Sequence, residues 1–181
     1  MEYSTLDKLG VRVSRLGFGC MRFPLTAEGK IDEPRAAAML DTAYKAGVTY
    51  YDTAYFYHQH TGEAFLGRAM KRYPRDTFYL ATKMPMSIVE SLDHAKEIFE
   101  GQLAALQTDY VDFYLLHGVN GERWKQAQEM GIVDFLLEMQ KAGRIRHFGF
   151  SFHGSYEEFE TILTARDWDF CQIQFNYMDQ E

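Results

Sequence analysis

The chain has 181 residues, 46% hydrophobic and 25% charged, a composition typical of one globular domain. Its net charge of −7 argues against a nucleic-acid-binding protein, and no apolar stretch is long enough to span a membrane. The first ten residues lack the apolar core of a signal peptide, and the two cysteines, Cys20 and Cys171, are far apart in the sequence. We therefore expect a cytoplasmic protein with reduced thiols.

The first 47 residues are expected to form a hairpin, a strand and a helix. Apolar and polar residues alternate over residues 2–16 around a turn at residues 8–10, which predicts a β-hairpin. A glycine-punctuated strand end follows over residues 16–21. Asp32 is placed to cap a helix with Pro34 in its first turn, and Gly47 is the residue type that commonly ends a helix.

From Val48 onward, predicted strands and helices alternate in units of about 30 residues, as in parallel β/α folds. No G-x-G-x-x-G motif follows a strand, which argues against a Rossmann fold. The sequence therefore predicts an α/β fold, a (β/α)8 TIM barrel with an N-terminal β-hairpin. After residues 16–21, strands are expected at 48–51, 77–83, 110–117, 146–151 and 170–175, and helices from Gly62 and at 89–106, 132–141 and 156–165.

The barrel domain covers residues 1–181 and includes only about six of the eight β/α units. A complete barrel typically has about 250 residues, and a parallel sheet ending at residues 170–175 would present an open, largely apolar edge. We therefore expect the domain to be C-terminally incomplete, as the first part of a longer protein whose gene continues past Glu181.

Four polar residues follow consecutive predicted strands. Asp52, Lys83 and His117 end three of these strands, and Tyr57 lies in the loop after the first. Each has an ordinary explanation alone: a capping carboxylate, a surface aromatic, a solvated lysine and a packed histidine. Since the carboxyl ends of parallel strands share one rim, where barrel enzymes carry out their chemistry, we expect all four to meet there.

Together these residue types predict a carbonyl reductase. A nearby lysine ammonium would lower the pKa of Tyr57 from about 10, while a carboxylate holds the lysine in place. Tyr57 would donate a proton to a carbonyl oxygen as hydride reaches the carbon, and a neutral His117 would orient the carbonyl. Because no side chain supplies hydride, a nicotinamide cofactor is implied.

Two other features near this loop have alternative readings. His58 and His60 have the spacing of two metal ligands on one strand face, but too few further ligands follow other strands, so a polar loop is favoured and no metal is expected. The aromatic residues Phe23, Tyr55 and Phe56, together with Tyr57, are consistent either with a substrate pocket or with ordinary packing.

Over essentially its whole length, the chain resembles the aldo-keto reductases. The matching segments are LGFGCMRF (16–23), YYDTAYFYHQHTGEAFLG (50–67), FYLATK (78–83), QLAALQTDYVDFYLLH (102–117), AGRIRHFGFS (142–151) and QIQFNY (172–177).

The resemblance implies a barrel closed at its base by the hairpin, and NADP(H)-linked reduction of aldehydes or ketones, with NAD(H) not excluded. It assigns the catalytic tetrad to Asp52, Tyr57, Lys83 and His117. Where many members have Ser-Asn, this chain has Ser151 followed by Phe152 and His153, and the family's adenosine-phosphate contacts lie on strands beyond the six predicted here. The implied cofactor contacts are Gly19, Cys20, Met21, Asp52, Ser151 and Gln172.

Two hypotheses therefore follow from the sequence. The first is an oxidoreductase acting on a small-molecule carbonyl, with neither nucleic acid nor membrane as a partner; the 181-residue chain, with part of the cofactor site outside it, is expected to be weakly active or inactive. The alternative is a non-catalytic barrel that senses cofactor as a binding or regulatory subunit. The intact tetrad favours the enzyme.

Overall fold

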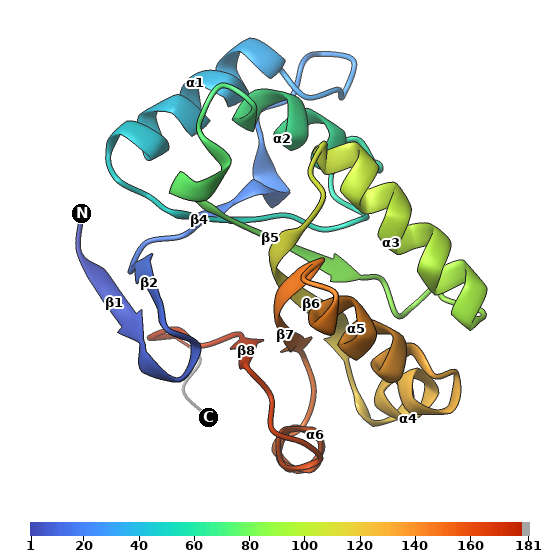
Figure 1. The fold of residues 1–181 in the computed structure, drawn as a ribbon. Helices are drawn as coiled ribbons and strands as arrows, with labels where there is room; N and C mark the ends of the chain where they lie inside the picture. Colours follow the sequence, from blue (N-terminus) through green and yellow to red (C-terminus); the bar gives the residue numbers. More distant parts are fainter. Residues whose placement is uncertain (179–181) are drawn as a thin grey trace.

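Six parallel strands form the central sheet of the protein, in the same order in space as in the sequence. The structure is a computed structural model that describes residues 1–178 (Figure 1). Because each strand is hydrogen-bonded to the next along the chain, every connection is a β/α crossover within one continuous sheet. The strands are β3 (Phe18–Gly19), β4 (Tyr50–Asp52), β5 (Tyr79–Met84), β6 (Val111–Val119), β7 (Ile145–Phe152) and β8 (Phe170–Ile173).

The six α-helices of the described residues lie in an arc around the outside of these strands (Figure 1). Four of them begin at a side-chain cap, supplied by Asp32, Ser91, Asn120 and Ser155, which accepts a backbone N–H of the first turn. Among residues 1–178, no helix is both long and apolar enough to cross a membrane. The helices are α1 (Glu33–Lys45), α2 (Gly62–Met70), α3 (Leu92–Leu106), α4 (Gly121–Glu129), α5 (Ile132–Lys141) and α6 (Tyr156–Thr164).

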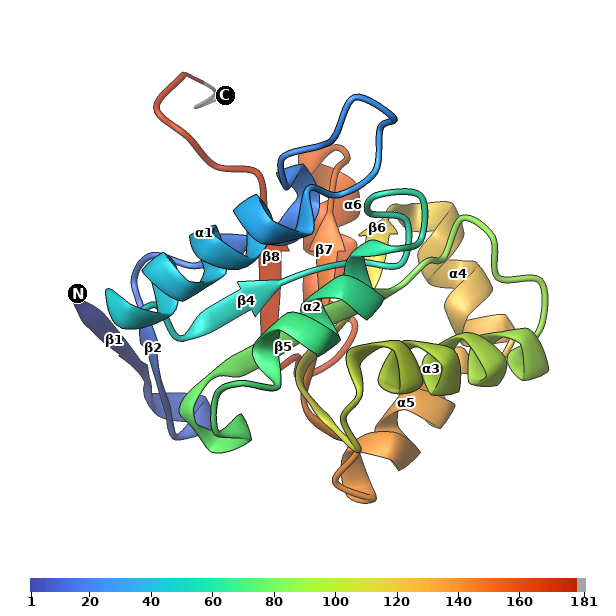
Figure 2. The ribbon, with the colours of Figure 1, turned by 90° about the horizontal axis from the view of Figure 1, so that it is seen from above.

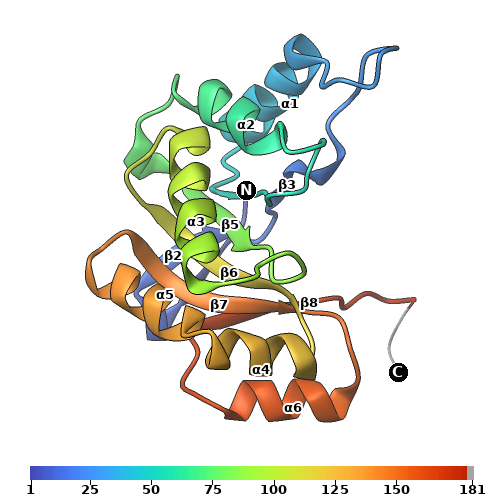
Figure 3. The same cartoon turned by 90° about the vertical axis from the view of Figure 1, so that its right-hand side faces the viewer.

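Neighbouring strands pack closely, and the strand direction rotates from one strand to the next across the sheet. In Figure 2, β4 runs across the direction of β8, as expected when twist accumulates from strand to strand, and Figure 3 shows the helices outside the curled sheet. Gly149 permits the close approach of β7 to β8, because a Cβ there would lie 2.3 Å from the carbonyl oxygen of Phe170. This curled parallel sheet confirms the prediction of a (β/α)8-type barrel represented by six units.

The N-terminal hairpin consists of β1 (Tyr3–Leu6) and β2 (Val11–Ser14), joined through the 3-10 turn η1 (Asp7–Leu9). Gly10 takes the left-handed conformation, with φ of 65°, where the chain reverses. Val11 and Val13 pack against an inner cluster that includes Phe113 and Leu115. The hairpin therefore packs on the inner face of the sheet at the amino ends of β4 and β5, where Tyr50 and Tyr79 lie, which is the end of the barrel that the resemblance implied it would close.

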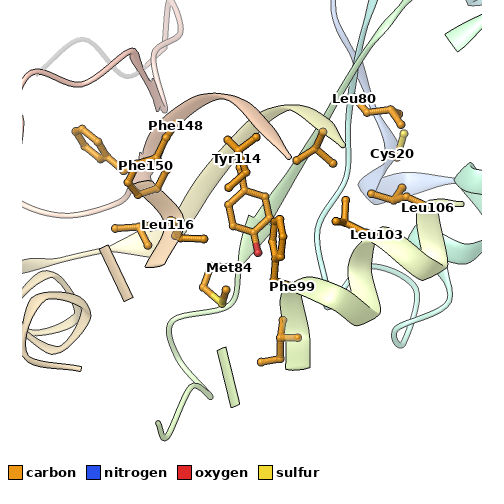
Figure 4. Packing of buried hydrophobic residues seen from close by; sticks show 14 of the residues in the cluster. Cys20, Leu80, Met84, Phe99, Leu103, Leu106, Tyr114, Leu116, Phe148 and Phe150 are labelled. Atoms are coloured by element: carbon orange, nitrogen blue, oxygen red, sulfur yellow. The ribbon is translucent and has the colours of Figure 1, made fainter. Parts of the chain in front are cut away.

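A larger apolar core lies between the sheet and the helices. Phe99 of α3 meets the ring of Tyr114 of β6 edge-on, with 5.2 Å between ring centroids, and both side chains are fully buried. Figure 4 shows these two rings beside Met84 and Leu116. From Phe113 to Leu116, the β6 side chains alternate between the inner cluster and this outer core, since successive residues of a strand point to opposite faces.

The sequence prediction was incomplete or displaced at two helices. Helix α4 was not predicted, because its sequence is mostly polar and only Trp124 and Ala127 are buried. Helix α3 begins at Leu92 rather than Val89, since Ser91 is extended and caps it by accepting the N–H of His94 at 3.1 Å.

Candidate active site

The period of two along each strand brings the candidate residues to one rim. Tyr50, Tyr79, Phe113 and Phe170 contribute to the inner cluster, and each lies on a strand that also carries a candidate residue. Two or four positions further along those strands, on the same face, come the residues that line a cavity at the carboxyl ends. Those strand residues are Asp52, Lys83, His117 and Gln172.

The cavity has a volume of about 140 Å³ and includes all four members of the predicted tetrad. Tyr57 reaches it from the loop after β4, and Ser151 from the end of β7. Three further lining residues were not predicted as site residues, because their contribution depends on how β8 and the loop after β7 approach the cavity. They are His153, Ile173 and Gln174.

Lys83 and Asp52 form a buried ion pair at the centre of this rim. Lys83 Nζ lies 2.6 Å from Asp52 Oδ1 and 2.7 Å from the carbonyl oxygen of Thr53, to both of which it donates. The exposed fractions of the Lys83 and Asp52 side chains are only 3% and 13%. As expected from the sequence, the carboxylate holds the lysine in place.

The second oxygen of Asp52 is buried but has no hydrogen-bond partner among the described residues. The Oγ1 atom of Thr53 is also buried and has no hydrogen-bond partner among the described residues. Buried polar atoms are normally paired, so an unpaired carboxylate oxygen beside a cavity is suited to accept a hydrogen bond from a bound molecule. A ribose hydroxyl is one such donor.

Tyr57 lies beside Lys83, but the prediction that this lysine lowers the pKa of Tyr57 is wrong in direction. Lys83 Nζ is 5.3 Å from the centroid of the Tyr57 ring, while its hydrogen bonds go to Asp52 and Thr53. Burial, followed by the negative charge of Asp52, raises the pKa of Tyr57 to about 12 instead of lowering it. Tyr57 is therefore a neutral hydrogen-bond donor in this arrangement.

His117 is held neutral, as predicted. Burial is the main cause that lowers its pKa to about 4, with further contributions from the charges of Lys83, His153 and Arg123. Its ring centroid is 6.4 Å from that of Tyr57, in an edge-on arrangement. Directly after it, Gly118 takes the left-handed conformation at the register shift between β6 and β7, and its N–H donates to Ser151 Oγ at 2.8 Å. Ser151 thus satisfies the backbone of the irregular part of β6 that follows His117.

The residues implied as cofactor contacts lie around the same rim. Gly19 pairs with Asp52 across β3 and β4, and a Cβ on Gly19 would meet no atom within 4 Å. The next residue, Cys20, is fully buried with its thiol toward the core, so it offers only its backbone, whereas Met21 is 52% exposed. Both cysteines are free, and burial raises the pKa of the Cys20 thiol.

Ser151 and Gln172 are direct neighbours in the register of β7 and β8. Both line the cavity, where a hydroxyl and a side-chain amide could recognise another amide. Together with the open backbone at Gly19 and the unpaired oxygen of Asp52, they fit a nicotinamide riboside. The residues present are therefore compatible with the cofactor that the sequence implied.

The two histidines after Tyr57 do not lie on a strand face. His58, Gln59 and His60 all have positive φ, between 53° and 67°, and form one turn of left-handed backbone. His58 stacks on Phe23, with 5.4 Å between ring centroids, and its Nε2 lies 3.0 Å from the carbonyl oxygen of Cys20. The turn therefore belongs to the loop between β4 and α2 and packs on the segment after β3, so the strand-face geometry that the metal alternative required is not present at these residues.

The aromatic residues of this region separate into two groups. Phe23 is 4% exposed and belongs to the core, where it meets Phe65 edge-on at 5.0 Å between centroids. Phe56 is 37% exposed, with its ring 6.4 Å from that of His117. Of these two residues, only Phe56, near the rim, remains a candidate for contact with substrate.

A parallel β/α sheet with an Asp–Lys pair, a tyrosine and a histidine at its carboxyl rim defines a β/α-barrel protein with a polar site where barrels of this class carry their active sites. The family model for the aldo/keto reductase family matches residues 15–181, and the chain belongs to that family.

Curated relatives include the aldo-keto reductase YhdN of Bacillus subtilis strain 168, 29% identical over 191 residues, and the probable aldo-keto reductase 1 of Glycine max, 28% identical over 154 residues. These alignments cover 100% and 81% of this chain but 56% and 43% of the relatives. The chain thus spans about half the length of the curated relatives it matches.

Solved structures show the same fold. The holo form of aldo-keto reductase AKR11C1 from Bacillus halodurans has a TM-score of 0.79 and 30% identity, covering 97% of this chain and 58% of that one. An aldo-keto reductase from Klebsiella pneumoniae in complex with NADPH has a TM-score of 0.69 and 24% identity, covering 92% and 55%. The first likeness supports the family; the second is a likeness of fold.

Proposed function

We propose that this site belongs to an NAD(P)H-dependent reductase that converts aldehydes or ketones to alcohols. The observation that carries the proposal is the buried Lys83–Asp52 pair in a cavity also lined by Tyr57 and His117. A nicotinamide bound against Ser151 and Gln172 would supply the hydride that none of these side chains can provide. Asp52 would serve twice, holding Lys83 through Oδ1 and a ribose hydroxyl through Oδ2.

In this proposal Tyr57 is the general acid. Its raised pKa keeps it protonated throughout the neutral range, and an alkoxide forming as hydride adds to the carbonyl carbon is a stronger base than a phenolate. The proton moves from the Tyr57 hydroxyl to the former carbonyl oxygen, and the product is an alcohol. The Lys83 ammonium, close to the ring, stabilises the phenolate that remains.

Neutral His117 orients the substrate. An imidazole that stays uncharged donates one N–H to the carbonyl oxygen without repelling the neighbouring lysine. The half-exposed Phe56 lies beside it and gives the substrate an apolar surface, which favours aromatic or other hydrophobic carbonyl compounds.

The direct test is product formation from 4-nitrobenzaldehyde with millimolar NADPH or NADH. The high cofactor concentration ensures that cofactor binding does not limit the rate. We expect slow turnover by this chain, with one alcohol formed for each cofactor oxidised. Cofactor binding with no alcohol, for every carbonyl compound tried, would contradict this proposal and support the cofactor-sensing subunit instead.

A further inference from the structure

Beneath the rim, four buried polar side chains form a network that the proposed reaction does not use. They come from α2, β5, α3 and β6, and their exposed fractions do not exceed 5%. Uncompensated burial of so many polar groups would be costly, which makes a network in such a place informative. Its members are Glu63, Thr82, Gln102 and Tyr114.

Gln102 is the centre of this network. Its Nε2 donates to Glu63 Oε1 and to the backbone carbonyl oxygen of Lys83, both at 2.9 Å. Its Oε1 accepts the hydroxyl of Tyr114 at 2.6 Å, which fixes the orientation of the amide. Thr82 also donates its hydroxyl to Glu63. The amide of Gln102 thus has partners on both its nitrogen and its oxygen.

The bond to Lys83 replaces one that the sheet cannot make. The carbonyl oxygen of Ala81 accepts from Thr53 N at 2.9 Å, and the pairing of β4 with β5 ends at Asp52 and Ala81. The carbonyl of Lys83 is the next acceptor on the same edge of β5, two residues further, where β4 no longer runs alongside. Gln102 supplies the donor that the neighbouring strand lacks.

The network also ties together the elements that carry the other rim residues. Glu63 is the second residue of α2, directly after Gly62, whose N–H donates to the carbonyl oxygen of Tyr57 at 3.1 Å. Tyr114 lies on β6 three residues before His117. The cluster therefore contacts the backbone of Lys83, includes a residue of the strand that carries His117, and lies next to the residue that holds the backbone of Tyr57.

Helices α2 and α3 are in direct backbone contact beside this network. A Cβ on Gly67, one turn after Glu63, would lie 2.5 Å from the carbonyl oxygen of Ala105. That close approach is what allows Glu63 and Gln102 to meet. The placement of the four side chains is therefore part of the packing of α2 on α3.

We infer that Gln102 is a positioning residue for the Lys83 ammonium: by holding the peptide carbonyl of Lys83 beyond the end of β4, it sets where the side chain meets Asp52 and Tyr57. This role in the reaction rests on the proposed function, whereas the effect on Lys83 does not. Gln102 itself does not line the cavity and touches no reacting atom.

The test is Gln102→Met, which keeps the length of the side chain and removes its hydrogen bonds. The readout is the rate at which the Lys83 ammonium protons exchange with water, followed through the 15Nζ resonance of that lysine. Loss of a buried hydrogen bond worth about 1.5 kcal/mol should speed the exchange about tenfold. The matched control is Gln128→Met, the same change at an exposed position of α4, which should leave the rate unchanged.

Tyr114→Phe is the second variant, in case Gln102→Met does not fold. It removes only the hydroxyl that orients the Gln102 amide and should speed the exchange in the same direction by a smaller factor. In the carbonyl-reduction assay, both variants should lower kcat while the dissociation constant of the cofactor stays within about twofold.

Unchanged Lys83 exchange in variants that fold would overturn the inference. So would a fall in cofactor affinity that accounts for the whole loss of rate. If the wild-type chain binds cofactor but reduces no carbonyl, the proposed function fails, and faster Lys83 exchange in the variants would still establish the positioning of the lysine.

Discussion

Lys83 Nζ and Asp52 Oδ1 lie 2.6 Å apart, although 31 residues separate them in the sequence. Both belong to strand ends on one rim, and both side chains are almost completely removed from solvent. Removing one member of such a pair leaves the other charge buried without a partner, which makes this contact a sensitive point for both stability and chemistry.

Asp52→Asn should lower the free energy of unfolding by about 3 kcal/mol, because the Lys83 ammonium would stay buried without a counter-charge. Urea unfolding followed by circular dichroism measures the change. Glu129→Gln is the control: its pair with Lys125 is 67% and 75% exposed, so this change should cost less than about 0.5 kcal/mol. Equal effects of the two substitutions on the free energy of unfolding would contradict the conclusion that the buried Lys83–Asp52 pair stabilises the fold.

Substitution of Asp112, at the opposite end of the strands, should affect stability but not the reaction rate. Its fully buried carboxylate accepts from Arg75 at 2.6 Å, Arg146 at 2.9 Å and the N–H of Leu80 at 2.9 Å. Asp112→Asn should cost about 2 kcal/mol of stability, less than a fully buried pair because both arginines reach solvent. The rate per folded molecule should not change, since this face stabilises the barrel; a large loss of kcat would refute that separation.

His117 should make stability depend on pH in the acidic range. Its pKa is about 6.5 in an unfolded chain and about 4 in the folded protein, so the unfolded state binds more protons between these values. The free energy of unfolding should therefore fall as the pH falls from 6.5 to 4, by up to about 1.4 kcal/mol per pH unit. His117→Gln should flatten the slope by this contribution. An NMR titration of His117 with a midpoint near 6.5 would disagree.

Gln59 is the middle residue of the left-handed turn after Tyr57, with φ of 54° and an exposed side chain. Left-handed backbone costs a non-glycine residue about 1 kcal/mol, so Gln59→Gly should raise the free energy of unfolding by up to that amount. Gln59→Val should lower it, because a β-branched side chain is more strained there. Thermal unfolding of both variants checks the opposite signs; the same sign for both would argue against the turn.

The convergence of Asp52, Lys83 and His117 was predictable because parallel strands end at one rim and side chains alternate with a period of two. Neither rule needs coordinates. The alternation of strands and helices was also predictable, since the spacing of apolar residues indicates whether each segment is a strand or a helix. Helix α4 escaped this reasoning because only two of its residues, Trp124 and Ala127, are buried.

The direction of the Tyr57 pKa shift could not be obtained from the sequence. It depends on where the Lys83 ammonium points, and that ammonium donates to Asp52 and the Thr53 carbonyl. Gln102 was likewise read only as part of a helix, because its partners come from three other elements. Side-chain direction and long-range polar pairing are properties of the assembled fold rather than of local pattern.

The most direct test of the central claim is the single-turnover rate of aldehyde reduction by Tyr57→Phe with saturating cofactor. Loss of the general acid should lower the rate about 100-fold or more, while cofactor affinity and the free energy of unfolding stay close to wild type. Tyr156→Phe, an exposed tyrosine of α6, should have no effect. A Tyr57→Phe variant that reduces the aldehyde at the wild-type rate would contradict the account.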